Sequence, residues 1–112
     1  MQLVKYETGQ HFGVHHDLGV LKDDGEVLVP KKRYDFPVRR RIMTIFIYLN
    51  SQQTGGHTYF PECGLRITPE AGKLVMWSNV LSNGQADKRT IHAGLPANTR
   101  KLGLNVWICE LI

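Results

Sequence analysis

The sequence has little of what would place it in a specialised structural class. Its only cysteines are Cys63 and Cys109, too few for a disulfide framework, so we expect a reducing compartment, although one bridge stays open. No apolar run approaches the roughly 18 residues that a membrane span needs, and the first residues alternate in polarity instead of forming a signal peptide. These absences predict an intracellular, cytoplasmic protein without membrane contact.

A strong excess of charge is also missing. The formal net charge of +4 permits an acidic or nucleic-acid partner without requiring one. With 42% hydrophobic and 21% charged residues, the composition is that of a globular chain. A length of 112 residues leaves room for one modest core. We therefore predict a single domain over residues 1–112.

No segment shows a helical period, and there is no internal repeat. Instead, short alternating or β-branched stretches are separated by turn residues. The most apolar stretch, residues 42–49, predicts a strand buried on both faces, with Thr44, Phe46 and Tyr48 on one side. The predicted strands cover residues 2–6, 12–15, 42–49, 57–60, 65–68, 73–77 and 102–109. Many short strands with regular turns indicate an all-β sandwich or barrel of the jelly-roll or cupin kind.

The longest break in this pattern is residues 18–41, which contain glycines, prolines and charged side chains and end in Arg39, Arg40 and Arg41. Loops of this length inside compact domains are usually functional or disordered. We predict a mobile lid at residues 18–41, and a solvated surface insertion is the alternative interpretation.

A candidate metal site begins with His15 and Asp17. In an extended segment these two side chains share one face, whereas His16 points to the opposite face. The triplet alone also fits two solvated residues at a strand end. The third candidate is His92, which is followed by Lys101. Two imidazoles and one carboxylate form the ligand set of non-heme Fe(II) sites, which leaves coordination positions open.

Several short motifs follow one another along nearly the whole chain. They are Tyr6-Glu7-x-Gly9-Gln10-x-Phe12 before His15-x-Asp17, Tyr48-Leu49-Asn50 before Gly55-Gly56-x-Thr58-x-Phe60-Pro61, Gly72-Lys73, and His92-Ala93-Gly94-x-Pro96 before Lys101 and Asn105-x-Trp107. In this order they resemble the catalytic core of prolyl 4-hydroxylases, among the Fe(II)- and 2-oxoglutarate-dependent dioxygenases. The resemblance implies a double-stranded β-helix whose open end holds the iron. Most of the helices that such domains carry before the Tyr6 region, where they would cover the larger sheet, are missing from this sequence.

The resemblance also implies roles for individual residues. It makes His15, Asp17 and His92 the iron ligands and catalytic residues. The residues implied to bind 2-oxoglutarate, with the Lys101 ammonium on the distal carboxylate, are Lys101, Tyr48, Thr44, Tyr6 and Asn105. The interval from His92 to Lys101 is slightly shorter than is usual in the family. A strand register shifted by one residue, in which Arg100 and not Lys101 faces the co-substrate, is therefore an open alternative. The implied cofactors are Fe(II), 2-oxoglutarate, O2 and ascorbate.

The activity implied by the resemblance is hydroxylation of peptidyl proline, coupled to decarboxylation of 2-oxoglutarate to succinate and CO2. The expected partner is a peptide or protein substrate that contains proline. Two alternatives stay open: an enzyme of the same superfamily that acts on lysine, a small molecule or nucleic acid, and a cupin-like metal-binding module without catalysis. Nucleic acid is disfavoured, because the stretch from Lys101 to Trp107 does not resemble the arginine-rich end of the repair enzymes. The sequence indicates neither the oligomeric state nor the substrate peptide.

Other residues with chemical potential are interpreted as structural. An aromatic residue in an apolar strand, such as Trp107, usually belongs to the core. His11, His16 and His57 are interpreted as surface or supporting residues. We expect the two cysteines to behave as small hydrophobic side chains.

Overall fold

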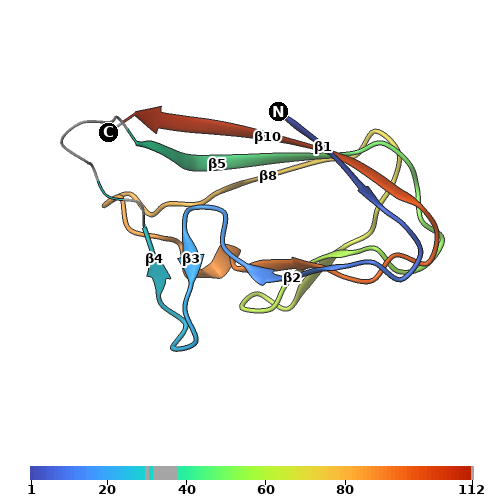
Figure 1. Ribbon diagram of the computed structural model, residues 1–112, viewed down its shortest axis with the longest axis horizontal. Helices are drawn as coiled ribbons and strands as arrows, with labels where there is room; N and C mark the ends of the chain where they lie inside the picture. The colour runs from blue at the N-terminus through green and yellow to red at the C-terminus, as the bar shows by residue number, and fades with distance from the viewer. Residues whose placement is uncertain (30, 32–37, 112) are drawn as a thin grey trace.

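The computed structural model describes residues 1–29, 31 and 38–111. Its elements are β1 (Gln2–Tyr6), β2 (Phe12–His15), β3 (Val20–Leu21), β4 (Val27–Leu28), β5 (Arg39–Tyr48), β6 (Thr58–Phe60), β7 (Leu65–Ile67), β8 (Leu74–Ser78), the short 3-10 helix η1 (Lys88–Thr90), β9 (His92–Gly94) and β10 (Lys101–Leu111). Two four-stranded sheets, ordered β1-β10-β5-β8 and β2-β9-β6-β7, face each other (Figure 1). The chain passes back and forth between these sheets, so the fold is the double-stranded β-helix that the sequence predicted.

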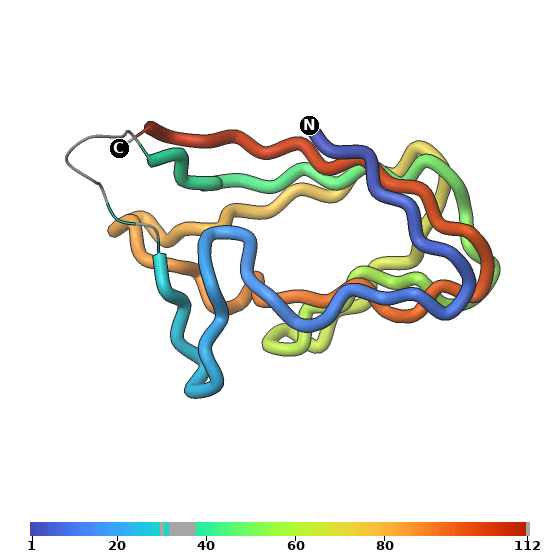
Figure 2. Tube along the Cα trace, in the orientation of Figure 1, coloured from blue at the N-terminus to red at the C-terminus, as the bar shows by residue number. Residues whose placement is uncertain are grey.

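The connections between the sheets close one end of the sandwich. Residues 7–11, 49–57 and 95–100 gather there, whereas the β3–β4 hairpin projects near the opposite end (Figure 2). Hydrogen bonds join these connections, because the Gly9 N–H donates to the Ala97 carbonyl at 2.7 Å and the Gly56 N–H donates to the Pro96 carbonyl at 2.9 Å. One end of the space between the sheets is therefore closed by hydrogen-bonded loops.

The two long strands β5 and β10 form the centre of the larger sheet. As predicted, Thr44, Phe46 and Tyr48 share one buried face of β5. Gly103 lies opposite Tyr48 in β10, and a Cβ atom there would come within 2.2 Å of the Phe46 ring. Glycine is required at this position because the aromatic ring lies directly on the backbone. The Phe46 ring in turn forms part of the interior wall near Lys101.

The other face of this sheet is more exposed than predicted. Ile45 and Ile47 are only half-buried. Leu74 is 52% exposed and Met76 is 62% exposed on the neighbouring strand β8. The prediction of a strand buried on both faces is therefore wrong for the outer face. Within residues 1–29, 31 and 38–111, the outward side chains lack the cover that the inward ones receive from the second sheet.

The predicted lid at residues 18–41 contains regular structure. Strands β3 and β4 pair as an antiparallel hairpin, with Val20 opposite Leu28. Strand β5 starts at Arg39 and pairs with β10 as far as Leu111, so Arg39, Arg40 and Arg41 belong to the sheet and not to a loop. The prediction of an irregular stretch up to residue 41 is wrong there, because the ladder with β10 continues. The rest of the predicted lid, at residues 30 and 32–37, lies outside the described residues, and mobility stays a prediction.

Two elements near the site were not predicted from the sequence. Strand β9 and helix η1 have three residues each, too few to establish a period. Their positions depend on partners elsewhere in the chain: β9 pairs with both β2 and β6. Pairing with β2 places His92 directly opposite His15.

Both cysteines are exposed free thiols in the described part of the chain, which does not support their prediction as small hydrophobic side chains. The possible bridge is not formed. The described residues include no helix with the length and apolar character needed to span a membrane.

Candidate metal and co-substrate site

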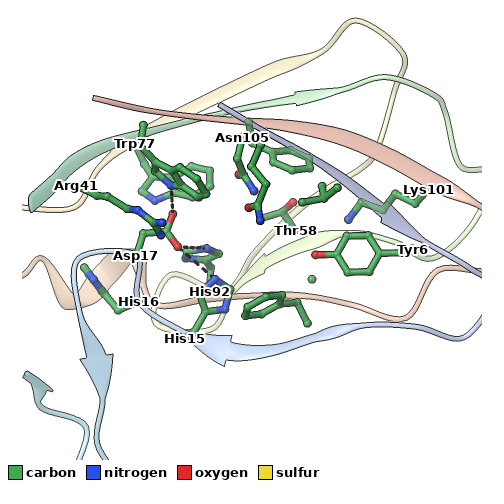
Figure 3. Close-up of a pocket in the computed structure, with 16 residues that line it drawn as sticks. Tyr6, His15, His16, Asp17, Arg41, Thr58, Trp77, His92, Lys101 and Asn105 are labelled. Atoms are coloured by element: carbon green, nitrogen blue, oxygen red, sulfur yellow. Dashed lines mark hydrogen bonds and ion pairs between the residues drawn. The ribbon is translucent and has the colours of Figure 1, made fainter. Parts of the chain in front are cut away.

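A cavity of about 330 Å³ lies between the two sheets. Its charged side chains are concentrated at two ends (Figure 3). One end carries His15, Asp17 and His92. The other end carries Lys101 with the ring of Tyr6 beside it. The first end comes from β2 and β9 of the smaller sheet and the segment after β2, and the second from β1 and β10 of the larger sheet, so neither site exists in a single segment of the chain.

The structure brings the three predicted metal ligands together. His15 and His92 are paired across β2 and β9. The Asp17 Oδ1 atom lies 3.3 Å from Nε2 of His15 and 3.3 Å from Nε2 of His92. One ligand atom from each side chain lies within 4.8 Å of the others. The arrangement gives two nitrogens and one oxygen on one side of the cavity, which is the facial ligand set of non-heme iron.

Backbone carbonyls orient both imidazoles. Nδ1 of His15 donates to the Gly13 carbonyl at 2.7 Å, and Nδ1 of His92 donates to the Thr90 carbonyl at 2.7 Å. In the neutral rings these bonds place the protons on Nδ1, so the Nε2 lone pairs face Asp17. Two nitrogen lone pairs and a carboxylate then converge, and a bound cation relieves their repulsion.

The second oxygen of Asp17 is held separately. Thr44 donates its hydroxyl hydrogen to Oδ2 at 2.6 Å, and the Trp107 indole N–H lies 3.4 Å from the same atom. Burial raises the pKa of Asp17, but the adjacent imidazoles of His15 and His92 and the hydrogen bond from Thr44 outweigh burial and hold that pKa well below its usual range. The carboxylate is therefore ionised. The Thr44 hydroxyl donates to Asp17, and Thr44 is not among the residues that line the cavity, so a contact of Thr44 with 2-oxoglutarate stays a prediction without support from these contacts.

Lys101 is the only strongly buried cation at the other end of the cavity among the described residues, at 2% exposure. Its Nζ lies 5.1 Å from the centre of the Tyr6 ring and 5.7 Å from those of Phe46 and Tyr48. Within the part of the chain that the structure describes, this ammonium has no hydrogen-bond or ion-pair partner. Burial lowers the pKa of Lys101 to about 8. A buried ammonium ringed by aromatic faces is a site for an anion.

The alternative register through Arg100 is not observed. The Arg100 side chain is 62% exposed and lies 3.3 Å from Glu7 on the surface. Lys101 faces the interior because adjacent residues of a strand point to opposite sides. Asn105 shares the inward face with Lys101 and lines the same cavity, as Tyr6 does.

Comparison with known proteins identifies the family. A family model described as the 2OG-Fe(II) oxygenase superfamily matches residues 1–109. The chain belongs to this superfamily. The match spans both ends of the cavity, from Tyr6 in β1 to Trp107 in β10.

Relatives of this oxygenase chain carry more specific names. Prolyl 4-hydroxylase subunit alpha-1 of Gallus gallus is 32% identical over 98% of this chain and 20% of that protein. A putative prolyl 4-hydroxylase of Acanthamoeba polyphaga mimivirus is 30% identical over 98% of this chain and 44% of that protein. The crystal structure of a viral collagen prolyl hydroxylase from Paramecium Bursaria Chlorella virus-1, in complex with 2OG, matches with a TM-score of 0.77 and 29% identity over 96% of this chain and 56% of that chain. The chain thus spans from a fifth to about half of the length of these relatives.

Thr58 is a candidate co-substrate residue of this oxygenase chain that sequence reasoning missed. The Tyr48 hydroxyl, predicted to contact 2-oxoglutarate, is fully buried and hydrogen-bonds to Thr58 Oγ1. Thr58, and not Tyr48, is among the side chains that line the cavity. The alternation of side chains along a strand could have identified Thr58, because Thr58 and Phe60 share the buried face of the short strand β6.

Trp107 was predicted to be a core aromatic residue, but it also contacts the site. It lines the cavity and reaches Asp17, and the Arg41 guanidinium lies 3.7 Å from the centre of a Trp107 ring. Burying the indole beside the carboxylate gives its N–H a hydrogen-bond partner. Sequence reasoning could place Trp107 on the inward face but could not show what the indole contacts.

Among the other histidines, His16 is buried and not on the surface. Its Nε2 donates to the Asp87 carbonyl at 2.9 Å, and its Nδ1 accepts from the Leu18 N–H at 3.1 Å. Because both ring nitrogens are used in this way, His16 supports the site without joining the ligands. His11 is exposed and His57 is partly exposed.

Proposed function

We propose that this chain is the catalytic core of an Fe(II)- and 2-oxoglutarate-dependent dioxygenase that hydroxylates prolyl residues in peptides. The observation that carries the proposal is one cavity with a His-Asp-His cluster at one end and, at the other, a buried lysine that has no partner among the described residues. A divalent metal and a dicarboxylate need these two features. The family to which the chain belongs supports the oxygenase part of this proposal.

The residues present fit the iron. His15 Nε2, His92 Nε2 and Asp17 Oδ1 would hold it and leave the remaining coordination positions open. Both imidazoles already have the tautomer that a metal ligand needs. With O2, bound Fe(II) supplies the chemistry that decarboxylates 2-oxoglutarate to succinate and CO2 and inserts oxygen into a substrate C–H bond.

The protein would bind and orient the co-substrate. The Lys101 ammonium pairs with the distal carboxylate of 2-oxoglutarate, and the Thr58 hydroxyl offers a second hydrogen bond. The Tyr6, Phe46 and Tyr48 rings exclude water around Lys101, which strengthens the ion pair. Bound in this way, the dicarboxylate would have its keto acid end toward the His-Asp-His cluster.

The substrate class is proposed from the relatives. Their names include prolyl 4-hydroxylases from an animal and a virus and a viral collagen prolyl hydroxylase. We therefore propose a proline-containing peptide or protein as substrate. Ascorbate is included as a reductant on the resemblance alone.

The test is a turnover assay with several substrate classes. The purified chain is given Fe(II), 2-oxoglutarate, O2 and ascorbate with a proline-rich peptide, a lysine-containing peptide or an alkylated oligonucleotide. We expect succinate release with the proline-rich peptide, matched by one added oxygen atom on a proline in its mass spectrum. Asp17→Ala serves as the inactive control. Succinate release with another substrate only would overturn the proline assignment, and failure to bind Fe(II) would overturn the whole proposal.

A further inference from the structure

Asn79 is a fully buried polar residue behind the metal ligands. It follows the last residue of β8 and is 0% exposed, as is Thr44 in the neighbouring strand β5. Asn79 Nδ2 donates to Thr44 Oγ1 at 2.9 Å and to the Arg41 carbonyl at 3.1 Å. The Arg41 carbonyl can only accept, which identifies this end of the Asn79 amide as the donor. Buried polar side chains need such partners, and these partners lead directly to the site.

The Asn79 amide determines where the Thr44 proton points. A hydroxyl has one hydrogen to donate. Because Thr44 Oγ1 accepts from Asn79, that hydrogen is directed to Asp17 Oδ2, at 2.6 Å. The hydrogen bonds therefore run in one direction, from Asn79 to Thr44 to Asp17.

The two oxygens of Asp17 then have different surroundings. Oδ2 accepts from Thr44 and Trp107. Oδ1 faces the Nε2 atoms of His15 and His92, each at 3.3 Å. A carboxylate held in this way presents one oxygen to a metal and keeps the other on protein donors.

The backbone of Asn79 is held as firmly as its side chain. Its N–H donates to the Ile42 carbonyl at 2.9 Å, and its carbonyl accepts from the Asp87 N–H at 3.0 Å. Asp87 begins the turn that carries Thr90, whose carbonyl orients His92. Asn79 is thus positioned by β5, the strand that carries Thr44, and by the turn that leads to His92.

We propose that Asn79 and Thr44 are positioning residues that make Asp17 a one-oxygen ligand of the metal, through Oδ1. This inference rests on the proposed function, because it needs a metal at the His-Asp-His cluster. Its consequence is that Asp17 takes up one coordination position only. The positions needed by a chelating keto acid stay open.

The test uses Co(II), whose visible absorption reports the number and kind of its ligands, and calorimetry for its affinity. Thr44→Val keeps the branched shape and removes the donor. We expect it to weaken Co(II) binding by about 10- to 100-fold, the usual effect of losing a group that orients a ligand, and to change the absorption bands. Thr44→Ser keeps the hydroxyl and should restore both. Gln52→Ala is the matched control, because Gln52 is buried and hydrogen-bonded outside the site. It should lower the melting temperature without moving the Co(II) bands.

A double variant tests whether Asn79 acts through Thr44. Asn79→Ala should weaken Co(II) binding in the same direction, and adding it to Thr44→Val should cause no further loss. A Thr44→Val protein with the affinity and spectrum of the parent would overturn the inference while leaving the metal site intact. Additive effects in the double variant would show that Asn79 does not act through Thr44. If the parent bound no Co(II), the proposed function and this inference would both fail. Should Thr44→Val not fold, Asn79→Ala and Thr44→Ser still give the comparison.

Discussion

The two ends of the cavity bury opposite charges in opposite ways. At one end, the Asp17 carboxylate accepts from Thr44 and Trp107 and faces two imidazoles. At the other end, the Lys101 ammonium has aromatic rings around it and no partner in the described residues. Burying an ion is unfavourable unless the ion is paired. The first end is therefore arranged in advance to hold a cation, whereas the second carries an uncompensated charge that an anion would neutralise.

The largest effect is expected from breaking the metal end. Removing any one of His15, Asp17 and His92 by substitution with alanine should abolish Co(II) binding, because each provides one of three convergent atoms. Calorimetry measures this directly. His11→Ala, at an exposed position, is the matched control and should bind like the parent. Normal Co(II) affinity in His15→Ala would show that the cluster has been assigned to the wrong residues.

At the lysine end, Lys101→Ala should weaken 2-oxoglutarate binding and leave the metal in place. Loss of one member of a buried charged pair removes roughly 2–5 kcal/mol, which corresponds to about thirtyfold or more in affinity. Titration of 2-oxoglutarate into the anaerobic Fe(II) protein, followed by its charge-transfer absorption, gives the dissociation constant. Arg100→Ala is the matched control, since that side chain pairs with Glu7 on the surface. The opposite ranking of these two variants would mean that the anion lies elsewhere.

The affinity for 2-oxoglutarate should also depend on pH. The pKa of Lys101 without ligand is lowered to about 8, so the ammonium loses its proton above that pH. A bound carboxylate favours the charged form and raises this pKa. Binding should be constant below pH 8 and then weaken by about tenfold per pH unit until the pKa of the complex is reached. The same titration at several pH values tests this, and Lys101→Ala should remove the inflection.

The charge of Lys101, which no other described residue pairs, should also affect the stability of the ligand-free protein. Lys101→Met keeps the long side chain and removes the charge, so it should raise the free energy of unfolding at neutral pH. The fall in pKa from 10.5 to about 8 corresponds to roughly 3 kcal/mol as an upper value. The gain should shrink between pH 8 and 10.5, because the unfolded chain keeps its proton there while the folded parent loses it. Urea unfolding at two pH values measures this difference, and a loss of stability in Lys101→Met would mean that the ammonium already has a partner.

The smallest effects are expected at the hydroxyls beside Lys101. Thr58→Val removes a cavity-lining donor and should weaken 2-oxoglutarate binding by about 1.5–3 kcal/mol, as for a hydrogen bond to a charged group. Tyr48→Phe should have a smaller effect, about 0.5–1.5 kcal/mol, because its hydroxyl bonds to Thr58. A larger loss of affinity in Tyr48→Phe than in Thr58→Val would show that Tyr48, and not Thr58, contacts 2-oxoglutarate directly.

Much of the site was accessible from alternation along single strands. The inward face of β5 with Thr44, Phe46 and Tyr48 followed from a period of two residues. The same rule placed Lys101 inward and Arg100 outward once the start of β10 was known. Alternation did not locate the end of the predicted lid at residues 18–41. Strand β5 begins as early as Arg39 because its pairing with β10 continues to that residue.

The sequence by itself determined the fold class, the inward faces of the long strands and the three candidate metal ligands. The tertiary structure alone decided which of them meet. Strand β9 is too short to be recognised, yet its pairing with β2 brings His92 to His15 across the chain. The Thr44 hydroxyl turns to Asp17 because Asn79, 35 residues further along, donates to it. Alternation is a property of neighbouring residues, whereas the direction of a hydrogen bond depends on partners that only the folded chain brings together.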